Sequence, residues 1–339
     1  MRNAVIQLHD AEYHDFVDYL RELGFERIVL GAPGFRFMSR PQLLGQYLRG
    51  TLHLLKELGS LQDAGTVFAF GRFAFAVKFL ARLRLVRYKR LFCFGFFVHE
   101  PHWFPLFRWL VRLDRENDHY VVFSRSEIGL YEGQMGIRRE RMHFVPLGDW
   151  GQLRQPRKEA VSPVVGQYYF AGGRSNRDYR ALVEAFRSIS ATLVIICSRS
   201  NRADLRGTDL PPNVTVLCDV PIAVFDDYVR RAKAGIIPLK HDTGASGQSL
   251  ALSLMRNAKC VIASDVGPLR EYVEDGVSGY LLANLTEELP SVIRRIEEED
   301  LASALGQAAR ERYERRFSRA AAAEALKGML DSVSVSPAA

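Results

Sequence analysis

The chain has 339 residues, of which 47% are hydrophobic and 25% charged, and its formal net charge is +7. This composition excludes a disordered chain and indicates a globular protein, and the length predicts two domains. No run reaches the ~18 apolar residues of a membrane-spanning helix. The opening residues MRNAVIQLHD lack the apolar segment of a signal peptide, and the four cysteines form no Cys-x-x-Cys pair. We therefore expect reduced core thiols and a cytoplasmic protein.

Strand-like and helical patterns alternate through the first half of the chain. Short apolar runs predict strands at residues 4–8, 27–30, 66–70, 91–98, 120–123 and 143–145. Helical periodicity predicts helices at 11–23, 39–58, 72–86, 103–115 and 125–135. Ser124 and Glu127 have the spacing of a capping box, which predicts the start of the last of these helices. Such alternation is typical of parallel strands in a doubly wound α/β sheet.

The stretch from Arg72 to Arg90 carries seven basic residues and no acid, interleaved with Phe, Leu and Tyr. Two interpretations stay open. A basic amphipathic segment can lie on an anionic membrane surface, whereas a core helix can present a solvated basic face. Nucleic acid is a weaker third choice because no known nucleic-acid-binding motif occurs, and we expect no such partner.

A stretch rich in proline, glycine and charge at residues 146–163 has no apolar period, and we place a linker at 151–163. It separates a first domain at 1–150 from a second at 164–317, which a C-terminal helical segment at 318–339 follows. In the second half, strands are predicted at 167–170, 192–197, 214–217, 234–238 and 259–263. Helices are predicted near 177–188, 222–232, 247–257, 286–298, 299–315 and 318–331.

A double-glycine turn follows the first strand of the second domain. Gly172 and Gly173 allow a tight turn, and Arg174 and Arg177 follow just before a helix. Arginine side chains and backbone N–H groups at such a turn can stabilise the charge of a diphosphate. The alternative is an ordinary helix-start loop with arginines on its surface.

A second glycine-rich loop opens the segment from Thr243 to Gly279. The small residues Gly244 to Gly247 precede a helical pattern, and the free N–H groups of such a helix start suit a phosphate. An apolar strand, the turn Gly267-Pro268 and Glu271 follow. The loop alone is equally compatible with any α/β unit that contains a Gly-rich loop.

The order of this whole segment resembles the nucleotide-sugar block of the retaining glycosyltransferases of family 4, which have the GT-B fold. The resemblance covers residues 165–332 and, in the first domain, rests on Phe97–His99 and residues 120–148. It implies two doubly wound Rossmann-like α/β domains facing across a cleft. The first would be the acceptor-side domain and the second the nucleotide-sugar-binding domain, with the helix at 318–339 packing back on the first.

The resemblance also implies an activity. The protein would be a retaining hexosyltransferase that moves a sugar from a nucleotide-diphosphate sugar to a glycan, lipid-linked or other hydroxyl acceptor. Cell-surface polysaccharide or glycolipid synthesis is the expected process, in the cytoplasm or peripherally at the inner face of the cell membrane. No metal or other cofactor is expected, because no ligand set has the required spacing and GT-B enzymes generally need no divalent ion.

Roles for individual residues follow from the same resemblance. Arg174 and Arg177 match the family's Gly-Arg…Lys element, and His99 matches a histidine at a strand end that points into the cleft. Ala245 and Ser253 stand where the family's Glu-x7-Glu carboxylates are expected, so both carboxylates are absent. The expected donor-binding residues are Gly172, Gly173, Ser198, Asp219, Val220, Ser246, Gly247, Gln248, Ser249 and Ser253.

Two further functions stay open at this point. The missing carboxylates also fit a catalytically weak GT-B subunit that binds a partner glycosyltransferase or a glycan. A GT-B nucleotide-sugar epimerase would require acid and base carboxylates in the cleft, and none can be assigned from the sequence.

Overall fold

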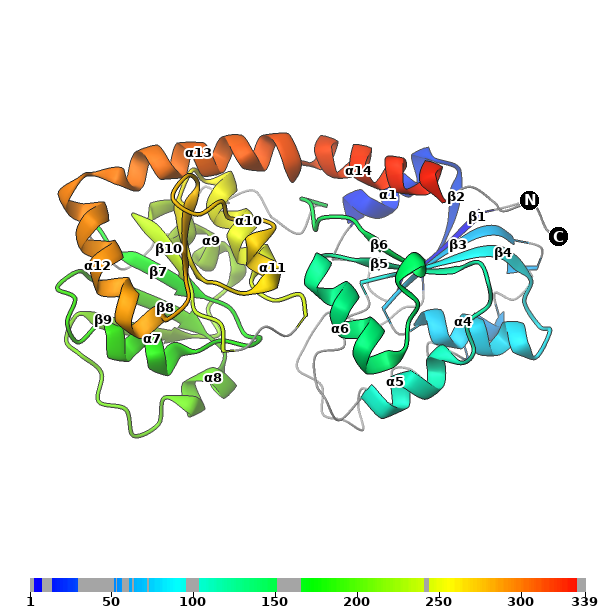
Figure 1. Ribbon diagram of the computed structural model, residues 1–339, viewed down its shortest axis with the longest axis horizontal. Helices are drawn as coiled ribbons and strands as arrows, with labels where there is room; N and C mark the ends of the chain where they lie inside the picture. The colour runs from blue at the N-terminus through cyan, green and yellow to red at the C-terminus, as the bar shows by residue number, and fades with distance from the viewer. Residues whose placement is uncertain are drawn as a thin grey trace. The chain divides into compact units, whose positions relative to one another are not determined.

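Two compact units make up the chain in the computed structural model, which describes residues 3–7, 14–29, 52, 54–56, 61–62, 64–71, 73–95, 104–150, 166–240 and 244–333. The first unit comprises Met1–Pro146, Trp150–Gln152 and Ala322–Ala339. The second comprises Leu147–Asp149 and Leu153–Ala321. Figure 1 labels the elements of both units, and each unit is described here by itself.

A parallel six-stranded sheet forms the centre of the first unit, in the order β2-β1-β3-β4-β5-β6. The predicted strands coincide with it to within three residues wherever their ends are described. The predicted helix at 39–58 lies largely outside the described residues. The strands are β1 (Asn3–Gln7), β2 (Phe25–Val29), β3 (Ala64–Phe70), β4 (Tyr88–Phe94), β5 (Asp118–Val122) and β6 (Met142–Phe144).

Alternating side chains of this sheet pack against helices on its two faces. On one face, Val67 and Tyr120 belong to a buried cluster with Leu80 of α4 (Phe73–Arg82) and Phe107 of α5 (Phe104–Val111). Tyr131 of α6 (Arg125–Met135) joins the same cluster. The predicted capping box of α6 is confirmed, since Ser124 N–H donates to Glu127 Oε2 at 3.1 Å.

The other face carries a stack of aromatic rings. Phe16 of α1 (His14–Glu22) is fully buried and lies 4.2 Å from Phe94 and 5.4 Å from Phe70, measured between ring centroids. The C-terminal helix α14 (Arg319–Ser332) belongs to this unit from Ala322 onward. Its Ala323 carbonyl accepts a hydrogen bond from Tyr19 Oη at 3.1 Å, which ties the last helix of the chain to the first.

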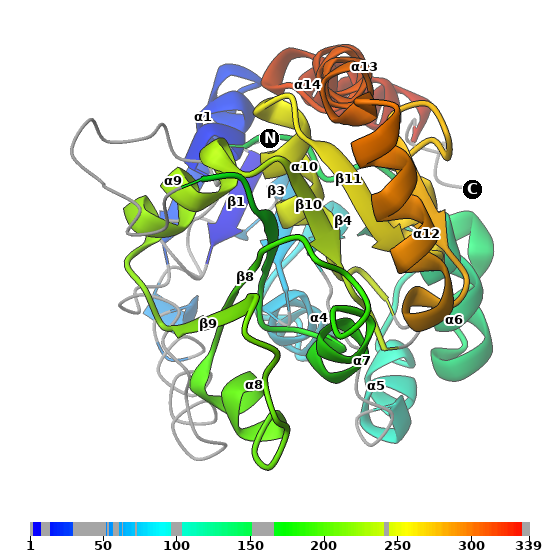
Figure 2. The ribbon, with the colours of Figure 1, turned by 90° about the vertical axis from the view of Figure 1, so that its left-hand side faces the viewer.

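The second unit is built on a parallel sheet in the order β12-β11-β10-β7-β8-β9. Counted within the unit, this is the strand order 3-2-1-4-5-6 of dinucleotide-binding folds. Figure 2 shows this sheet with β8 and β9 on one side of β10 and with β11 on the other. The strands are β7 (Tyr169–Gly172), β8 (Leu193–Cys197), β9 (Val214–Cys218), β10 (Ala234–Ile237), β11 (Cys260–Ser264) and β12 (Gly279–Leu282).

Helices cover both faces of this sheet, so its central strands are apolar throughout, and every residue of β8 and β11 is buried. The predicted helices are found, and α8 and β12 are additional elements that the sequence did not indicate. No described helix is both long and apolar enough to cross a membrane. The helices are α7 (Tyr179–Ala185), α8 (Arg199–Asp204), α9 (Ile222–Arg231), α10 (Gln248–Arg256), α11 (Gly267–Arg270), α12 (Leu285–Glu298) and α13 (Leu301–Arg316).

Candidate functional site

The strands β7 and β10 are parallel neighbours, and the order in which successive strands are added to the second sheet reverses between them. Ligands of open α/β sheets bind beyond the carboxyl ends of the strands at such a switch point. The loops that leave these two strands are held together by backbone hydrogen bonds. Asp178 N–H donates to the Pro238 carbonyl at 3.0 Å, and Lys240 N–H donates to the Asn176 carbonyl at 3.2 Å. The two glycine-rich loops singled out in the sequence therefore leave neighbouring strands.

The turn after β7 requires both of its glycines. A Cβ atom on Gly172 would lie 2.7 Å from the Phe225 ring. Gly173 has a φ of +115°, and a Cβ atom there would lie 2.4 Å from Arg177 Nη2. Since real Cβ atoms do not approach so closely, any larger residue would move the turn. The glycine pair lets the backbone fold directly over the Arg177 guanidinium.

Arg177 lies beneath this turn and is only 6% exposed. Its Nε donates to the Gly172 carbonyl at 2.9 Å and its Nη1 to the Ser175 carbonyl at 2.6 Å. Burial lowers the pKa of Arg177 from its usual value, and the nearby Tyr179 hydroxyl acts in the opposite direction. The guanidinium therefore holds the shape of the turn from inside. Arg174, in contrast, is exposed on the outer side of the same turn.

Asn201 connects this turn to the end of β8. Its Nδ2 donates to the Arg174 carbonyl at 3.1 Å, and its Oδ1 accepts a hydrogen bond from Ser198 Oγ at 2.7 Å. Ser198 is the N-cap of α8 and is 2% exposed. Sequence reasoning did not single out Asn201, although an asparagine three residues after a serine at a strand end is a recognisable N-cap spacing.

The loop after β9 lies beside this region. Asp219 has a φ of +49°, and its N–H donates to the Cys197 carbonyl at 3.0 Å. Its Oδ2 lies 3.2 Å from Arg199 Nε, an ion pair at the surface. Val220 follows and is half-buried. The predicted donor-binding residues Ser198, Asp219 and Val220 are thus on adjacent strand ends at the same edge of the sheet.

The helix α10 begins with backbone N–H groups that no side chain of the described residues caps. Its N-cap is Gly247, which has a φ of +88°. A Cβ atom added to Gly247 would lie 3.0 Å from Ile237 Cγ2. Ser246 before it is buried, Ser249 after it is exposed, and Ser253 one turn further on is half-buried. This uncapped helix start carries the positive end of the helix dipole.

Gln248 is the first residue of α10 and is 3% exposed. Its Nε2 has no hydrogen-bond partner among the described residues. An unpaired buried amide costs about 1–3 kcal/mol, so Gln248 Nε2 calls for a partner outside the described residues, such as a water or a bound ligand. This orphan amide is the clearest sign of a ligand in the second unit, and it lies at the helix start where an anion is favoured.

The predicted residues of the second unit therefore fall into three groups at one edge of the sheet: the turn after β7, the ends of β8 and β9, and the start of α10. His99 lies outside the described residues, so the structure gives no account of it. Among the described residues, no group of three or more His, Cys, Asp or Glu is arranged to hold a metal ion.

Comparison with known proteins bears on this unit directly. The family model described as "Glycosyl transferases group 1" matches residues 167–299, the stretch that contains all the elements of the site. The chain is a glycosyltransferase enzyme. No curated protein matches the chain. Its assignment to family 4 stays a prediction.

Solved structures match almost the whole chain. Sucrose-phosphate synthase from Thermosynechococcus elongatus is 15% identical with a TM-score of 0.73, and the match covers 98% of this chain and 99% of that one. HepE from Anabaena, in complex with UDP and glucose, is 14% identical with a TM-score of 0.70 and coverage of 98% and 100%. A glycosyltransferase from Rickettsia africae is 12% identical with a TM-score of 0.67 and coverage of 98% and 98%. These likenesses show the GT-B fold, with two Rossmann-like α/β domains.

Proposed function

We propose that this glycosyltransferase binds a nucleotide-diphosphate sugar at the carboxyl edge of the second sheet and transfers the sugar with retention. The orphan amide of Gln248, buried at the uncapped start of α10, carries the proposal. The N–H groups of α10 would hold a phosphate oxygen. The Gln248 amide would donate to a sugar hydroxyl, and in this way would replace the carboxylate that the family has and Ala245 lacks.

The turn after β7 would serve the leaving group. During transfer the bond between the anomeric carbon and the phosphate oxygen breaks, and the diphosphate gains negative charge. Arg174 is exposed on this turn and would neutralise that charge, while the buried Arg177 keeps the turn in place. The acceptor hydroxyl would pass its proton to the departing phosphate oxygen, so no strong base is required. His99 would position the sugar or the acceptor.

The nucleoside would lie against Ser198, Asp219 and Val220, and Ser253 would give the ribose one hydrogen bond. The Anabaena structure was solved with UDP-glucose, so a UDP-hexose is the first donor to test. The acceptor would be a hydroxyl of a glycan, a lipid-linked sugar or a related molecule. Cell-surface polysaccharide or glycolipid synthesis would use such a transfer.

Donor binding and donor turnover, measured on the same variants, test the proposal. Calorimetry with UDP, GDP and ADP measures nucleotide affinity, and hydrolysis of the matching sugar nucleotides measures bond cleavage. Gln248→Ala should lower hydrolysis of the sugar nucleotide by at least tenfold while changing the affinity for the bare nucleotide by less than about threefold, because the lost bond of about 1.5 kcal/mol is to the sugar. Gln307→Ala, on the exposed side of α13, is the matched control.

Three outcomes would contradict the proposal in different ways. An equal loss of nucleotide affinity and hydrolysis would mean that the loop contacts only phosphate. Nucleotide binding without any cleavage, in the presence of varied hydroxyl acceptors, would favour the catalytically weak subunit. Conversion of the donor to its epimer would favour the epimerase.

A further inference from the structure

Large apolar side chains exposed to solvent gather on one side of the first unit. In the described chain, only a few large hydrophobic residues are more than about two-fifths exposed, and five of them lie on α4, on the loop after it and on α5. A soluble protein rarely leaves a contiguous apolar patch without a function. The five are Phe79 (51% exposed), Leu83 (52%), Leu85 (41%), Leu106 (44%) and Trp109 (55%).

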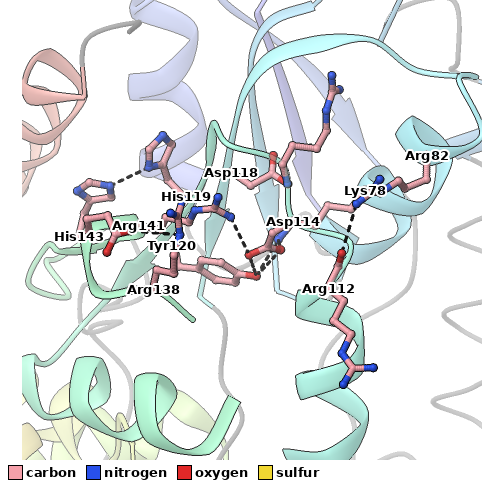
Figure 3. A network of polar contacts seen from close by, with 12 residues as sticks. Lys78, Arg82, Arg112, Asp114, Asp118, His119, Tyr120, Arg138, Arg141 and His143 are labelled. Atoms are coloured by element: carbon pink, nitrogen blue, oxygen red, sulfur yellow. Dashed lines mark hydrogen bonds and ion pairs between the residues drawn. The ribbon is translucent and has the colours of Figure 1, made fainter. Parts of the chain in front are cut away.

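The two helices form one surface although about twenty residues separate them in sequence. Their buried sides meet through Phe75 and Phe107, whose ring centroids are 5.5 Å apart. At their C-terminal ends, Arg82 Nη2 donates to the Arg112 carbonyl at 3.4 Å, as Figure 3 shows. Figure 1 and Figure 2 both place α4 next to α5. We call the outward side of this pair the α4–α5 surface.

Exposed basic side chains accompany the apolar ones along α4, α5 and the segments that follow these helices. Neither helix contains an acidic residue, and the loop from Leu83 to Arg87 contains none either. Arg108 is the basic residue closest in sequence to Trp109, and its guanidinium also bonds the Gln134 carbonyl at 2.8 Å. The exposed basic residues are Arg82, Arg84, Arg87, Lys89, Arg108 and Arg112.

The structure corrects the sequence-based picture of this region. Lys78 is fully buried, where its Nζ donates to Asp114 Oδ1 at 2.6 Å and to Tyr120 Oη at 2.8 Å (Figure 3). Phe73, Phe75 and Leu80 are also buried. Within this stretch, α4 (Phe73–Arg82) is therefore a core helix on one side, and Tyr88–Arg90 already belong to strand β4. The outer side of α4 is completed by α5, which the sequence analysis did not connect with it.

We propose that the α4–α5 surface docks the protein on an anionic lipid bilayer. Trp109 and Phe79 would enter the interface, where aromatic side chains are favoured, and the leucines would add apolar area below the headgroups. The arginines would contact lipid phosphates, each strengthening binding by roughly fivefold. An acid-free basic rim around exposed aromatic residues complements an anionic bilayer better than another folded protein, whose surface carries both charges. The proposal does not depend on the donor site.

Vesicle co-sedimentation of the full chain tests this directly. Vesicles of phosphatidylcholine alone and vesicles with about one-third phosphatidylglycerol are compared at low and high salt. Binding should require the anionic lipid and weaken with salt. The variant Phe79→Ser/Trp109→Ser should bind at least about tenfold more weakly. Val277→Ser is the matched control, since Val277 is 51% exposed on the second unit.

Charge reversal tests the basic rim separately. Arg84→Glu/Arg87→Glu should reduce binding to anionic vesicles by at least tenfold. Arg294→Glu/Arg315→Glu changes the net charge by the same amount at exposed positions of the second unit, and should retain most of the binding. Equal losses in the two double variants would mean that only net charge matters, and the assigned surface would be wrong.

Tryptophan fluorescence locates the contact. In a Trp103→Phe background the remaining tryptophans are Trp109 and the buried Trp150. Brominated phosphatidylglycerol should quench the emission, and Trp109→Phe should abolish the quenching. Vesicle binding with no quenching would overturn the proposal. A second result would also overturn the proposal. If the wild type does not bind vesicles but forms concentration-dependent dimers, and if Phe79→Ser/Trp109→Ser abolishes these dimers, the surface binds a second copy of the chain.

Discussion

Two arginines three residues apart have very different surroundings in this protein. Arg174 is exposed on the turn after β7, whereas Arg177 is buried and bonded to the backbone carbonyls of Gly172 and Ser175. The sequence marks both as candidate diphosphate ligands, because a spacing says nothing about which side of a turn each side chain occupies. Their burial separates a contact residue from a positioning residue.

Substitution of each arginine should therefore affect a different quantity. Arg174→Ala should weaken UDP binding by at least about 1.5 kcal/mol, roughly tenfold, and leave the urea midpoint unchanged. Arg177→Met should lower the free energy of unfolding by about 1–3 kcal/mol, because the buried Gly172 carbonyl and the part-buried Ser175 carbonyl lose their donor. Calorimetry and urea unfolding measure the two effects. Arg206→Ala, at an exposed position of the same unit, should change neither.

A pair of histidines gives the first unit a pH dependence. His143 Nε2 and His119 Nδ1 are 3.0 Å apart, so one ring donates to the other. Burial, followed by the charges of His143, Arg141, Arg90 and Lys78, lowers the pKa of His119 to about 4, and burial also lowers the pKa of His143. The unfolded chain binds these protons from about pH 6.5 downward.

The free energy of unfolding should consequently be highest above about pH 6.5 and should fall as the pH drops towards 4, because folding must expel protons there. Both rings are partly exposed, so we expect solvent screening to limit the loss to about 1 kcal/mol between neutral pH and about pH 5. Urea unfolding of the wild type and of His119→Gln/His143→Gln gives the comparison. Equal slopes against pH would show that the pair does not contribute.

At the scale of single elements, two helices of the second unit approach neighbouring elements so closely that a Cβ atom added to the glycine at the contact would clash. A Cβ atom on Gly306 of α13 would lie 2.1 Å from the Ala258 carbonyl oxygen, and one on Gly235 of β10 would lie 2.2 Å from Leu254 Cδ1. The Ala258 carbonyl oxygen is a backbone atom, and it cannot rotate away from an added Cβ atom as the Leu254 side chain can. The approach of α13 to the residues before β11 therefore requires Gly306.

Gly306→Ala should lower the free energy of unfolding of the second unit by about 1–3 kcal/mol through overpacking. Gly328→Ala on α14 is the matched control, because no atom lies within 4 Å of its added Cβ. It should raise stability by about 0.5–1 kcal/mol through helix propensity. Thermal unfolding of the two variants should thus shift in opposite directions, and a stabilised Gly306→Ala would show that α13 can move aside.

The sequence predicted most elements because their hydrophobic periods are strong. The runs at 193–197 and 260–263 are apolar throughout, as is typical of central parallel strands. The strand Gly279–Leu282 has only four residues and follows a glycine turn, so its apolar pattern is too short to be recognised in the sequence. The orphan amide of Gln248 and the contact of α4 with α5 depend on tertiary packing, which no local pattern contains.

At the scale of the whole molecule, the first unit is assembled from both ends of the chain. Ala322 and Leu326 of α14 are fully buried, and the Val333 carbonyl accepts a hydrogen bond from Arg90 Nη1 at 2.5 Å. The first unit therefore lacks a buried helix until the C-terminal residues are present.

A chain that stops at residue 321 should have a destabilised first unit. Burial of Leu326 and Met329 contributes about 1.5–3 kcal/mol each, so the loss should reach several kcal/mol. Hydrogen exchange should show faster exchange in β1 and β3 and little change in β8. A chain that stops at residue 333 keeps the described part of α14 and should behave like the wild type. Unchanged protection in the shorter chain would contradict this role of α14.

The return of α14 to the first unit has a consequence for synthesis on the ribosome. Domains usually fold in the order in which they are translated. Here the strands of the first unit leave the ribosome before the second unit, but the helix that completes the first unit leaves it after the second unit. All residues of the second unit are translated before Ala322, so this unit can reach its native structure earlier. Part of the apolar surface of the first unit thus stays uncovered until α14 has left the ribosome, and in that interval the first unit needs a chaperone more than the second unit does.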